Sequence, residues 1–289
     1  MNSRLLTCLL ISAVANAAEL KPETLKAWED YLQTANSHMK ERLHSGAHFL
    51  WLDESSDRIQ QVHSGEILAD PIDGQIPARV PSGLIHHWIG AAFIPNVTLN
   101  ETVAVVRDYA RYPDIYPAVI ASKPVSRVSM QDKFSVLMMS NRLVQKKALE
   151  TQNASDFFKL NEKQWYSLCR TTQVQEIENV GQSSERKLAD GEGTGYIWRL
   201  YSITRFEERD GGVYVELEAL ALTRDIPASL RWVAAPVVRR ISRNSVLASL
   251  GKTQEAVKSF AAGRPIKRDT IAERHLPVTS SIIQSFHQP

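Results

Sequence analysis

The stretch YIWRLYSITRFEERDGGVYVELEALALTRDIP, residues 196–227, decides the fold. It contains two long runs rich in β-branched and aromatic residues, joined by Asp210-Gly211-Gly212, a strong signal for a tight β-hairpin. The period-2 alternation places Val213, Val215, Leu217, Ala219 and Ala221 on one face of the second strand. We therefore expect two antiparallel strands with this face turned toward the protein interior.

The inner face of this hairpin has the composition of a pocket lining. Its side chains become smaller toward the end of the second strand, which leaves room for a ligand or for a close-packed helix. The first strand contributes large apolar groups and two hydroxyls to the same face: Trp198, Leu200, Ser202, Thr204 and Phe206. Two alternatives stay open, a ligand pocket with a few orienting polar groups and a filled core with internally bonded hydroxyls.

The opposite face of the hairpin carries charges. Arg199 and Arg205 can pair across the strands with Glu216 and Glu218. Paired carboxylates and arginines can be catalytic, but on the outer face of an antiparallel sheet such residues usually form a cross-strand charge ladder, and we expect one here.

A second informative stretch is RDYARYPDIYPAV, residues 107–119. Pro113 and Pro117 disfavour helical geometry in the residues before them, so a helix over residues 97–110 must end near Arg111. Three tyrosines then form a bulky end wall: Tyr109, Tyr112 and Tyr116. This wall is either the amphipathic rim of a cavity or a plug that closes the end of the sheet.

The remaining elements follow from periodicity and turn residues. An amphipathic helix is expected over residues 22–43, with Leu25, Trp28, Leu32, Ala35, Met39 and Leu43 on its apolar stripe. A strand pair over 47–53 and 58–68, a linker over 70–83 and a strand over 86–95 should follow. Further extended segments are expected over 118–128, 134–143, the run to 158, and 164–178. A helical stretch over 228–240, interrupted at Pro236, precedes a final helix over 242–262, whose inner stripe is Val246, Leu250, Val257 and Phe260.

This order of elements resembles the helix-grip fold of the START-related superfamily, which includes polyketide cyclase-like and birch-pollen-allergen-like proteins. The resemblance covers roughly residues 82–262, and the two quoted stretches carry it. It implies an α+β fold in which a curved antiparallel sheet wraps around a long C-terminal helix. Here the chain adds an N-terminal helix and strand-pair extension over 18–81 and a C-terminal tail over 263–289.

The resemblance implies a protein that holds a hydrophobic small molecule, such as a lipid, an isoprenoid or a polyketide-like compound, between sheet and helix. It is also compatible with transient membrane contact. A cyclase- or hydrolase-like enzyme using the same cavity and a structural module with a filled core remain alternatives. The expected ligand-binding residues are Tyr109, Tyr112, Tyr116, Trp198, Leu200, Ser202, Thr204, Phe206, Val215, Leu217, Ala219, Ala221, Val246, Leu250 and Val257.

Motifs for other chemistry are missing from the sequence. Adjacent His86 and His87 in a strand point to opposite faces, and Gly46 lies between His44 and His48, so no metal site is expected. The sequence has no nucleophile elbow or phosphate-binding loop, and residues 191–195, GEGTG, precede a strand instead of following one. No cofactor is therefore predicted, and Cys169 is expected to be a small core residue.

The N-terminal residues read as an export signal. Arg4 precedes an apolar run from Leu5 to Ala15, and Ala15 and Ala17 have the spacing that a signal peptidase recognises. We expect cleavage after Ala17 and a periplasmic or secreted protein, with a short membrane anchor as the alternative. Removing Arg4 takes the formal charge from +2 to +1, and the basic residues are scattered, which argues against a nucleic-acid partner.

Overall fold

The computed structural model describes residues 18–44, 47–72, 77–140 and 147–266. Among these residues the strands of the main sheet are β2 (Leu68–Pro71), β3 (Ala78–Val80), β4 (Gly83–Pro95), β5 (Val119–Val128), β6 (Gln131–Ser140), β7 (Lys147–Lys159), β8 (Gln164–Glu178), β9 (Arg186–Lys187), β11 (Arg199–Arg209) and β12 (Gly212–Arg224). Their order is β2-β4-β12-β11-β8-β7-β6-β5, with β3 added to β4 and β9 to β8, and every pair is antiparallel. A small separate sheet joins β1 (Ala18–Glu19) to β10 (Glu192–Gly193).

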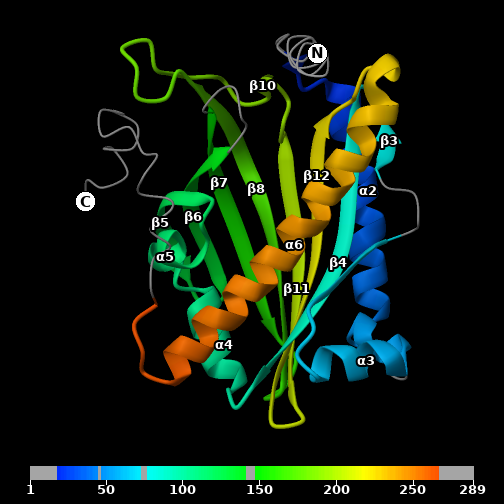
Figure 1. The fold of residues 1–289 in the computed structure, drawn as a ribbon, viewed down its shortest axis with the longest axis vertical. Helices are drawn as coiled ribbons and strands as arrows, with labels where there is room; N and C mark the ends of the chain where they lie inside the picture. Colours follow the sequence, from blue (N-terminus) through cyan, green and yellow to red (C-terminus); the bar gives the residue numbers. More distant parts are fainter. Residues whose placement is uncertain (1–17, 45–46, 73–76, 141–146, 267–289) are drawn as a thin grey trace, which may run out of the picture.

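The sheet curves around the long helix α6 (Arg231–Ala261), which crosses its concave face diagonally (Figure 1). This is the helix-grip arrangement predicted from the sequence. The β11–β12 hairpin lies in the middle of the sheet, with Asp210 at the turn in a left-handed conformation, φ 55°. In the observed register Thr204 lies opposite Leu217 and Ser202 opposite Ala219, so the two inner faces predicted by alternation do coincide.

Helix α4 (Leu99–Val106) begins with a capping box. The Thr98 hydroxyl accepts from the Glu101 backbone N–H, and the Glu101 carboxylate accepts from the Thr98 backbone N–H. The chain then continues through the 3-10 turn η2 (Tyr109–Arg111) into the short helix α5 (Tyr112–Ile115). Pro113 lies in the first turn of α5, where its missing N–H costs nothing, so it starts a helical turn instead of ending one.

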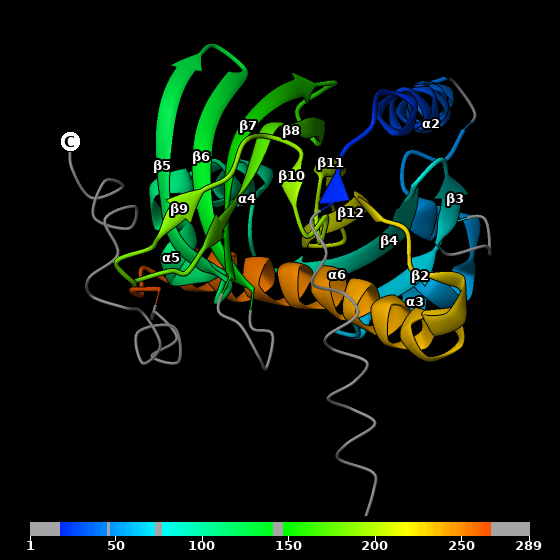
Figure 2. The ribbon, with the colours of Figure 1, turned by 90° about the horizontal axis from the view of Figure 1, so that it is seen from above.

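The N-terminal segment covers the convex face of the sheet, opposite α6 (Figure 2). Its helix α2 (Pro22–Glu41) buries Trp28, Ala35 and Met39 in the same core as Ile203 and Tyr214 of the hairpin. The predicted apolar stripe is thus confirmed except at its end, because Leu43 is exposed.

The predicted strand pair over 47–53 and 58–68 is wrong. The chain forms the 3-10 helix η1 (Trp51–Glu54) and the helix α3 (Ser56–His63), and only the final residues of this region enter β2. Ile59 and Val62 are three residues apart, which puts both side chains on one helical face toward the convex core. The predicted linker over 70–83 instead contributes β3 and the end of β2 to the edge of β4.

The two predicted C-terminal helices form one continuous helix. Pro236 lies inside α6, near the beginning of the helix. Proline has no N–H to donate to the carbonyl of Trp232, four residues earlier. Because Trp232 is exposed, water can hydrate that carbonyl instead. Phe260, expected on the inner stripe, is exposed, whereas Val246, Leu250 and Val257 are buried. Within the described ranges, no helix has both the length and the apolar character required to cross a bilayer.

Candidate functional site

The concave face of the hairpin lies beneath α6, but only part of it is filled. Phe206 and Val215 pack in one hydrophobic core with residues of α4 and α6, and the helix contributes Val246, Leu250 and Val257. Among the predicted site residues these five are core residues with at most 4% exposure.

The rest of the hairpin's concave face is partly exposed, although Leu217 and Ala219 also pack against the core under α6. The predicted lining residues toward the other end of the hairpin are all partly exposed: Leu200, Ser202, Thr204, Leu217, Ala219 and Ala221. Residues that alternate with them and face α2 are buried, among them Tyr201, Ile203, Leu220 and Leu222. This part of the concave face is therefore more exposed than the convex face behind it, because the N-terminal segment covers the convex face and α6 leaves this part of the concave face partly uncovered.

Two buried nitrogen atoms on the neighbouring strand face the same side. His86 and Trp88 of β4 lie opposite Ala221 and Ala219 in the register, so their side chains adjoin the accessible strip. His86 Nδ1 and Trp88 Nε1 have no hydrogen-bond partner among the described residues, although both side chains are at most 3% exposed. Burial lowers the pKa of His86 to about 4, so its ring is neutral near pH 7.

The hydrogen bonds of His86 define what these atoms can bind. Its Nε2 lies 3.1 Å from Thr223 Oγ1, and this hydroxyl donates to the Arg224 carbonyl at 3.3 Å. The role of Nδ1 depends on the tautomer: it is an acceptor when Nε2 carries the proton and a donor when Nε2 accepts from the hydroxyl, whereas the Trp88 indole N–H is a donor in either case. This part of the concave face thus offers a bound molecule one indole donor and one imidazole nitrogen.

The three tyrosines form a closed wall at the other side of the concave face. Tyr109 stacks on Phe134 at 3.9 Å between ring centroids, and Tyr112 meets Tyr116 edge to face. Each hydroxyl has a protein partner: Tyr109 donates to Asp132, Tyr112 donates to the Val106 carbonyl, and Tyr116 lies 2.9 Å from Thr253 of α6. The tyrosine wall was expected to be either the rim of a cavity or a plug at the end of the sheet. Because every hydroxyl has a protein partner, the geometry favours a plug that also attaches α6.

Trp198 differs from its predicted place. It packs in the convex core with Tyr201 and Leu222, and not beside Leu200 and Ser202. The reason is that β11 begins only at Arg199, so the alternation that orders the strand does not extend to Trp198. Its backbone N–H still donates to the Leu222 carbonyl.

Cys169 lies in the same region as Tyr109 and Phe134. Burial raises the pKa of its thiol to about 12, so it is protonated at neutral pH and is a poor nucleophile. Among the described residues, no group of three His, Cys, Asp or Glu side chains is arranged to hold a metal ion.

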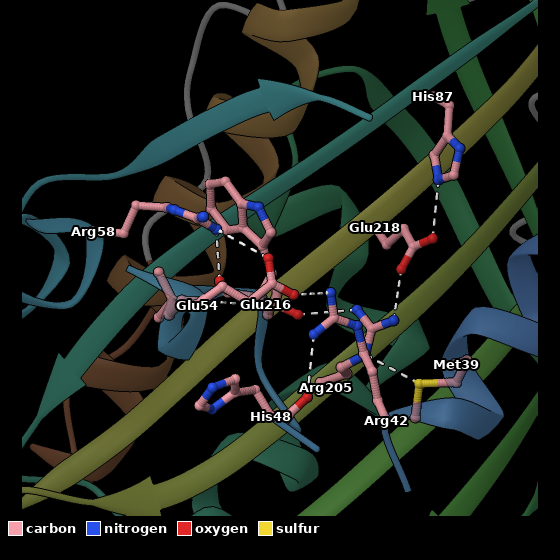
Figure 3. A network of polar contacts seen from close by, with 11 residues as sticks. Met39, Arg42, His48, Glu54, Arg58, His87, Arg205, Glu216 and Glu218 are labelled. Atoms are coloured by element: carbon pink, nitrogen blue, oxygen red, sulfur yellow. Dashed lines mark hydrogen bonds and ion pairs between the residues drawn. The ribbon is translucent and has the colours of Figure 1, made fainter. Parts of the chain in front are cut away.

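The charged residues on the convex face form a buried network (Figure 3). Arg205 donates to Glu216 at 2.9 Å and to Glu218 at 2.6 Å, and all three side chains are at most 5% exposed. Glu218 also lies 2.9 Å from His87 Nε2, whose Nδ1 contacts the Tyr31 hydroxyl of α2. The predicted ladder through Arg205 is confirmed, but it is sealed from water by the N-terminal segment. Arg199 instead pairs with Asp190.

The two carboxyl groups of this network have different pKa values. Burial raises the pKa of Glu216 to about 7 against the opposing charge of Arg205. Burial alone would also raise that of Glu218, but the hydrogen bond with His87 and the charge of Arg205 lower its pKa to about 2. Two neighbouring carboxyl groups with different pKa values can act as acid and base in catalysis when the site is open to a substrate. Here Met39 and the Leu52 backbone N–H complete the surroundings, and the network anchors α2 and η1 to the sheet.

Sequence reasoning found the hairpin lining but missed three features. The sequence pattern presents His86 only as a possible metal ligand and does not mark Trp88, and the burial of the convex charges depends on α2, which is distant in sequence. Alternation along 86–95 could have placed His86 and Trp88 on the inner face, since Ala92 and Ile94 continue the same side.

No protein-family model matches the chain, and no curated protein matches it by sequence. Solved structures with a similar fold include TTHA0849 from Thermus thermophilus, at 13% identity and a TM-score of 0.42, covering 59% of this chain and 96% of that one. A STAR-related lipid transfer protein fragment from Xanthomonas axonopodis matches at 13% identity and a TM-score of 0.40, covering 66% and 99%. Human STARD10 matches at 10% identity and 0.42, covering 86% and 93%.

The similar structures also include the Zhui aromatase/cyclase, at 12% identity and a TM-score of 0.38, and a START superfamily protein from Mycobacterium smegmatis, at 11% and 0.34. At these identities and TM-scores they describe a likeness of fold and do not identify what this chain binds.

Proposed function

We propose that the protein holds a hydrophobic small molecule, such as a lipid, an isoprenoid or a polyketide-like compound, on the concave face beneath α6. The observation that supports this most is the partly exposed strip of Leu200, Ser202, Thr204, Leu217, Ala219 and Ala221 on the inner side of the sheet. Apolar surface with a few hydroxyls is typical of a pocket for such a molecule.

His86 and Trp88 narrow the chemistry of the ligand. An unpaired buried donor or acceptor costs about 1 to 3 kcal/mol, and a ligand that pairs with both atoms would recover that energy. We therefore expect a mainly apolar molecule with a hydrogen-bond acceptor for the Trp88 indole and a second polar group for the His86 ring nitrogen. Cyclase- or hydrolase-like activity has less support, because the ionisable network of Arg205, Glu216 and Glu218 is on the sealed convex face.

The test is uptake of an apolar fluorescent probe by the wild type and by Ala219→Trp. Ala219 lies between Ser202 and Trp88 in the sheet, so an indole there should occupy the strip and abolish uptake while the protein stays folded. Ala248→Trp, on the exposed side of α6, is the matched control and should bind as the wild type does.

Thermal unfolding of the same variants completes the test. If the strip is instead part of a filled core, Ala219→Trp would overpack it and cost about 1 to 3 kcal/mol. Strong destabilisation of Ala219→Trp, together with no probe uptake by the wild type, would refute the binding function. Mass spectrometry of the protein purified from its native compartment would identify the ligand.

We also propose transient membrane contact through the beginning of α6. Trp232 is 81% exposed, and Val237 and Ile241 on the same half of the helix are exposed as well. Exposed apolar side chains of this kind partition into a bilayer interface. Cosedimentation with vesicles should fall in Trp232→Ala, and equal cosedimentation of the variant would count against this contact.

A further inference from the structure

A groove between β2 and α6 carries an excess of positive charge. It has a volume of about 530 Å³ and is lined by Ala69, Asp70, Pro71, Trp88, Pro236, Arg239, Arg240, Arg243 and Asn244. Its walls come from the N-terminal extension on one side and from the first half of α6 on the other, and Figure 2 shows these two elements adjacent. Three arginines and one aspartate therefore line a single groove.

The arginines are not neutralised by the described part of the protein. Neither Arg239 nor Arg240 forms an ion pair with a described acidic residue, and both are exposed. Arg239 and Arg243 are four residues apart on one helical face, where like charges destabilise a helix. Asp70 lines the groove without forming an ion pair to any of the three among the described residues. This arrangement favours an anion between them.

Arg243 has a structural contact that the other two lack. Its Nε donates to the Ala69 carbonyl at 3.1 Å, which holds α6 against β2 and fixes the width of the groove. Arg239 and Arg240 are free of such contacts within the described ranges, so their five-donor planar groups remain available for a carboxylate or a phosphate.

Trp88 lies between this groove and the partly exposed concave strip. Its side chain lines the groove, and in the sheet it lies opposite Ala219, one of the strip residues. Its indole N–H has no partner among the described residues. A molecule lying on the strip could therefore extend past Trp88 toward the arginines.

We propose that Arg239, Arg240 and Arg243 bind the carboxylate or phosphate head of an amphiphile whose apolar part lies on the concave strip. This rests on the proposed binding function and adds the class of ligand, an anionic amphiphile. Trp88 marks the junction between the apolar part and the head. The guanidinium groups select against a neutral molecule of the same shape, which leaves them without a counter-charge.

The experiment compares cis-parinaric acid with its methyl ester, two fluorescent probes that share one chain and differ in charge. The wild type should bind the acid about ten-fold more tightly than the ester, which corresponds to one charge-assisted contact. In Arg239→Gln/Arg240→Gln this preference should disappear while the affinity for the ester is unchanged. Arg186→Gln, an exposed arginine on β9, is the control and should keep the preference.

The possible outcomes separate this inference from the binding function. Equal affinity of the wild type for acid and ester, or a preference retained in the double variant, would overturn the head-group site and leave the binding function standing. Binding of neither probe would overturn both. Inorganic phosphate distinguishes the sources of an anion: if phosphate alone binds the wild type as tightly as the acid does and fails to bind the double variant, the groove is a site for a free anion and the assignment to an amphiphile is wrong.

Discussion

Arg205 is the residue on which the convex charge network depends. It is 1% exposed and provides the counter-charge for both Glu216 and Glu218. Arg205→Met should cost about 3 to 5 kcal/mol, because it leaves two buried carboxyl groups without the counter-charge of the arginine. Urea unfolding measures this loss, and Arg186→Met, which breaks an exposed pair with Glu178, should cost less than about 1 kcal/mol.

A triple variant tests whether uncompensated buried charge causes the loss of stability in Arg205→Met. Replacing Arg205, Glu216 and Glu218 together by Met, Leu and Leu removes the buried charges as well as their pairing, and should cost less than Arg205→Met alone. If the single and triple variants lose equal stability, the loss comes from packing of the arginine stem and not from uncompensated charge.

His86 makes stability depend on pH. Its folded pKa of about 4 lies below its ordinary value of 6.5, so between these values the unfolded chain binds a proton that the folded protein does not. The stability that depends on the neutral ring is fully present above pH 6.5 and decreases as the pH falls to 4, by up to about 3 kcal/mol. The free energy of unfolding at pH 7 minus that at pH 4.5 should therefore be more positive in the wild type than in His86→Gln.

The variant comparison is necessary because Glu216 acts in the opposite direction. Its raised pKa of about 7 means that the folded protein binds the extra proton between pH 4.5 and pH 7, so its contribution to stability falls as the pH rises through that window. A pH dependence that is the same in wild type and His86→Gln would show that His86 is protonated without cost, and so is not buried as the structure has it.

At the scale of elements, Gly90 sets the distance between α6 and the sheet. A Cβ at this position would lie 2.6 Å from the Leu68 carbonyl oxygen and 2.8 Å from a Val246 methyl. Gly90→Ala should therefore push β2 or α6 away and cost about 1 to 3 kcal/mol. Gly251→Ala, inside α6 with its nearest neighbour at 3.4 Å, should instead stabilise the protein by about 0.5 to 1 kcal/mol.

The pair of glycine variants is measured by thermal unfolding under one condition. Because both substitutions add the same methyl group, opposite signs would show that close approach of the helix to the sheet, and not alanine itself, decides the result. Destabilisation by both variants would contradict the observed packing of α6 against Ile67.

Elements differ in how well the sequence predicts them. The β11–β12 hairpin has strict alternation and a specific turn, so its register and faces follow from local pattern. RIQQVH, residues 58–63, has no such alternation, and its helical form is fixed by contacts of Val62 with the convex core. Pro236 was expected to break α6, but in the exposed first turns of the helix its cost is small. Tertiary contacts therefore decide the segments that the local pattern leaves ambiguous.

On the scale of the whole molecule, the sheet packs against a helix on each face: α6 on the concave face and α2 on the convex face. The apolar stripe over residues 22–43 predicts a helix that docks on the domain and can cover part of the cavity, but α2 packs in the convex core and not over the concave strip. Figure 2 shows α2 on the convex face and α6 on the concave face. Sealing the convex face with α2 provides a second core, so the concave face need not be filled completely for the protein to be stable.

The last prediction concerns the chain from Ala18 onward. If the export signal is removed after Ala17, the new amino terminus lies directly on β1, where Ala18 pairs with Gly193. Cys169 is then the single cysteine of the mature chain, so no internal disulfide can form and a reductant should leave the melting temperature unchanged. N-terminal sequencing of the protein recovered from outside the cytoplasm should begin with Ala18. Ala15→Arg combined with Ala17→Arg should block the cleavage, since signal peptidase requires small side chains there. Recovery of exported wild-type protein that still begins with Met1 would refute the processing site, and a melting temperature that falls with reductant would reveal a disulfide that a single cysteine cannot make within one chain.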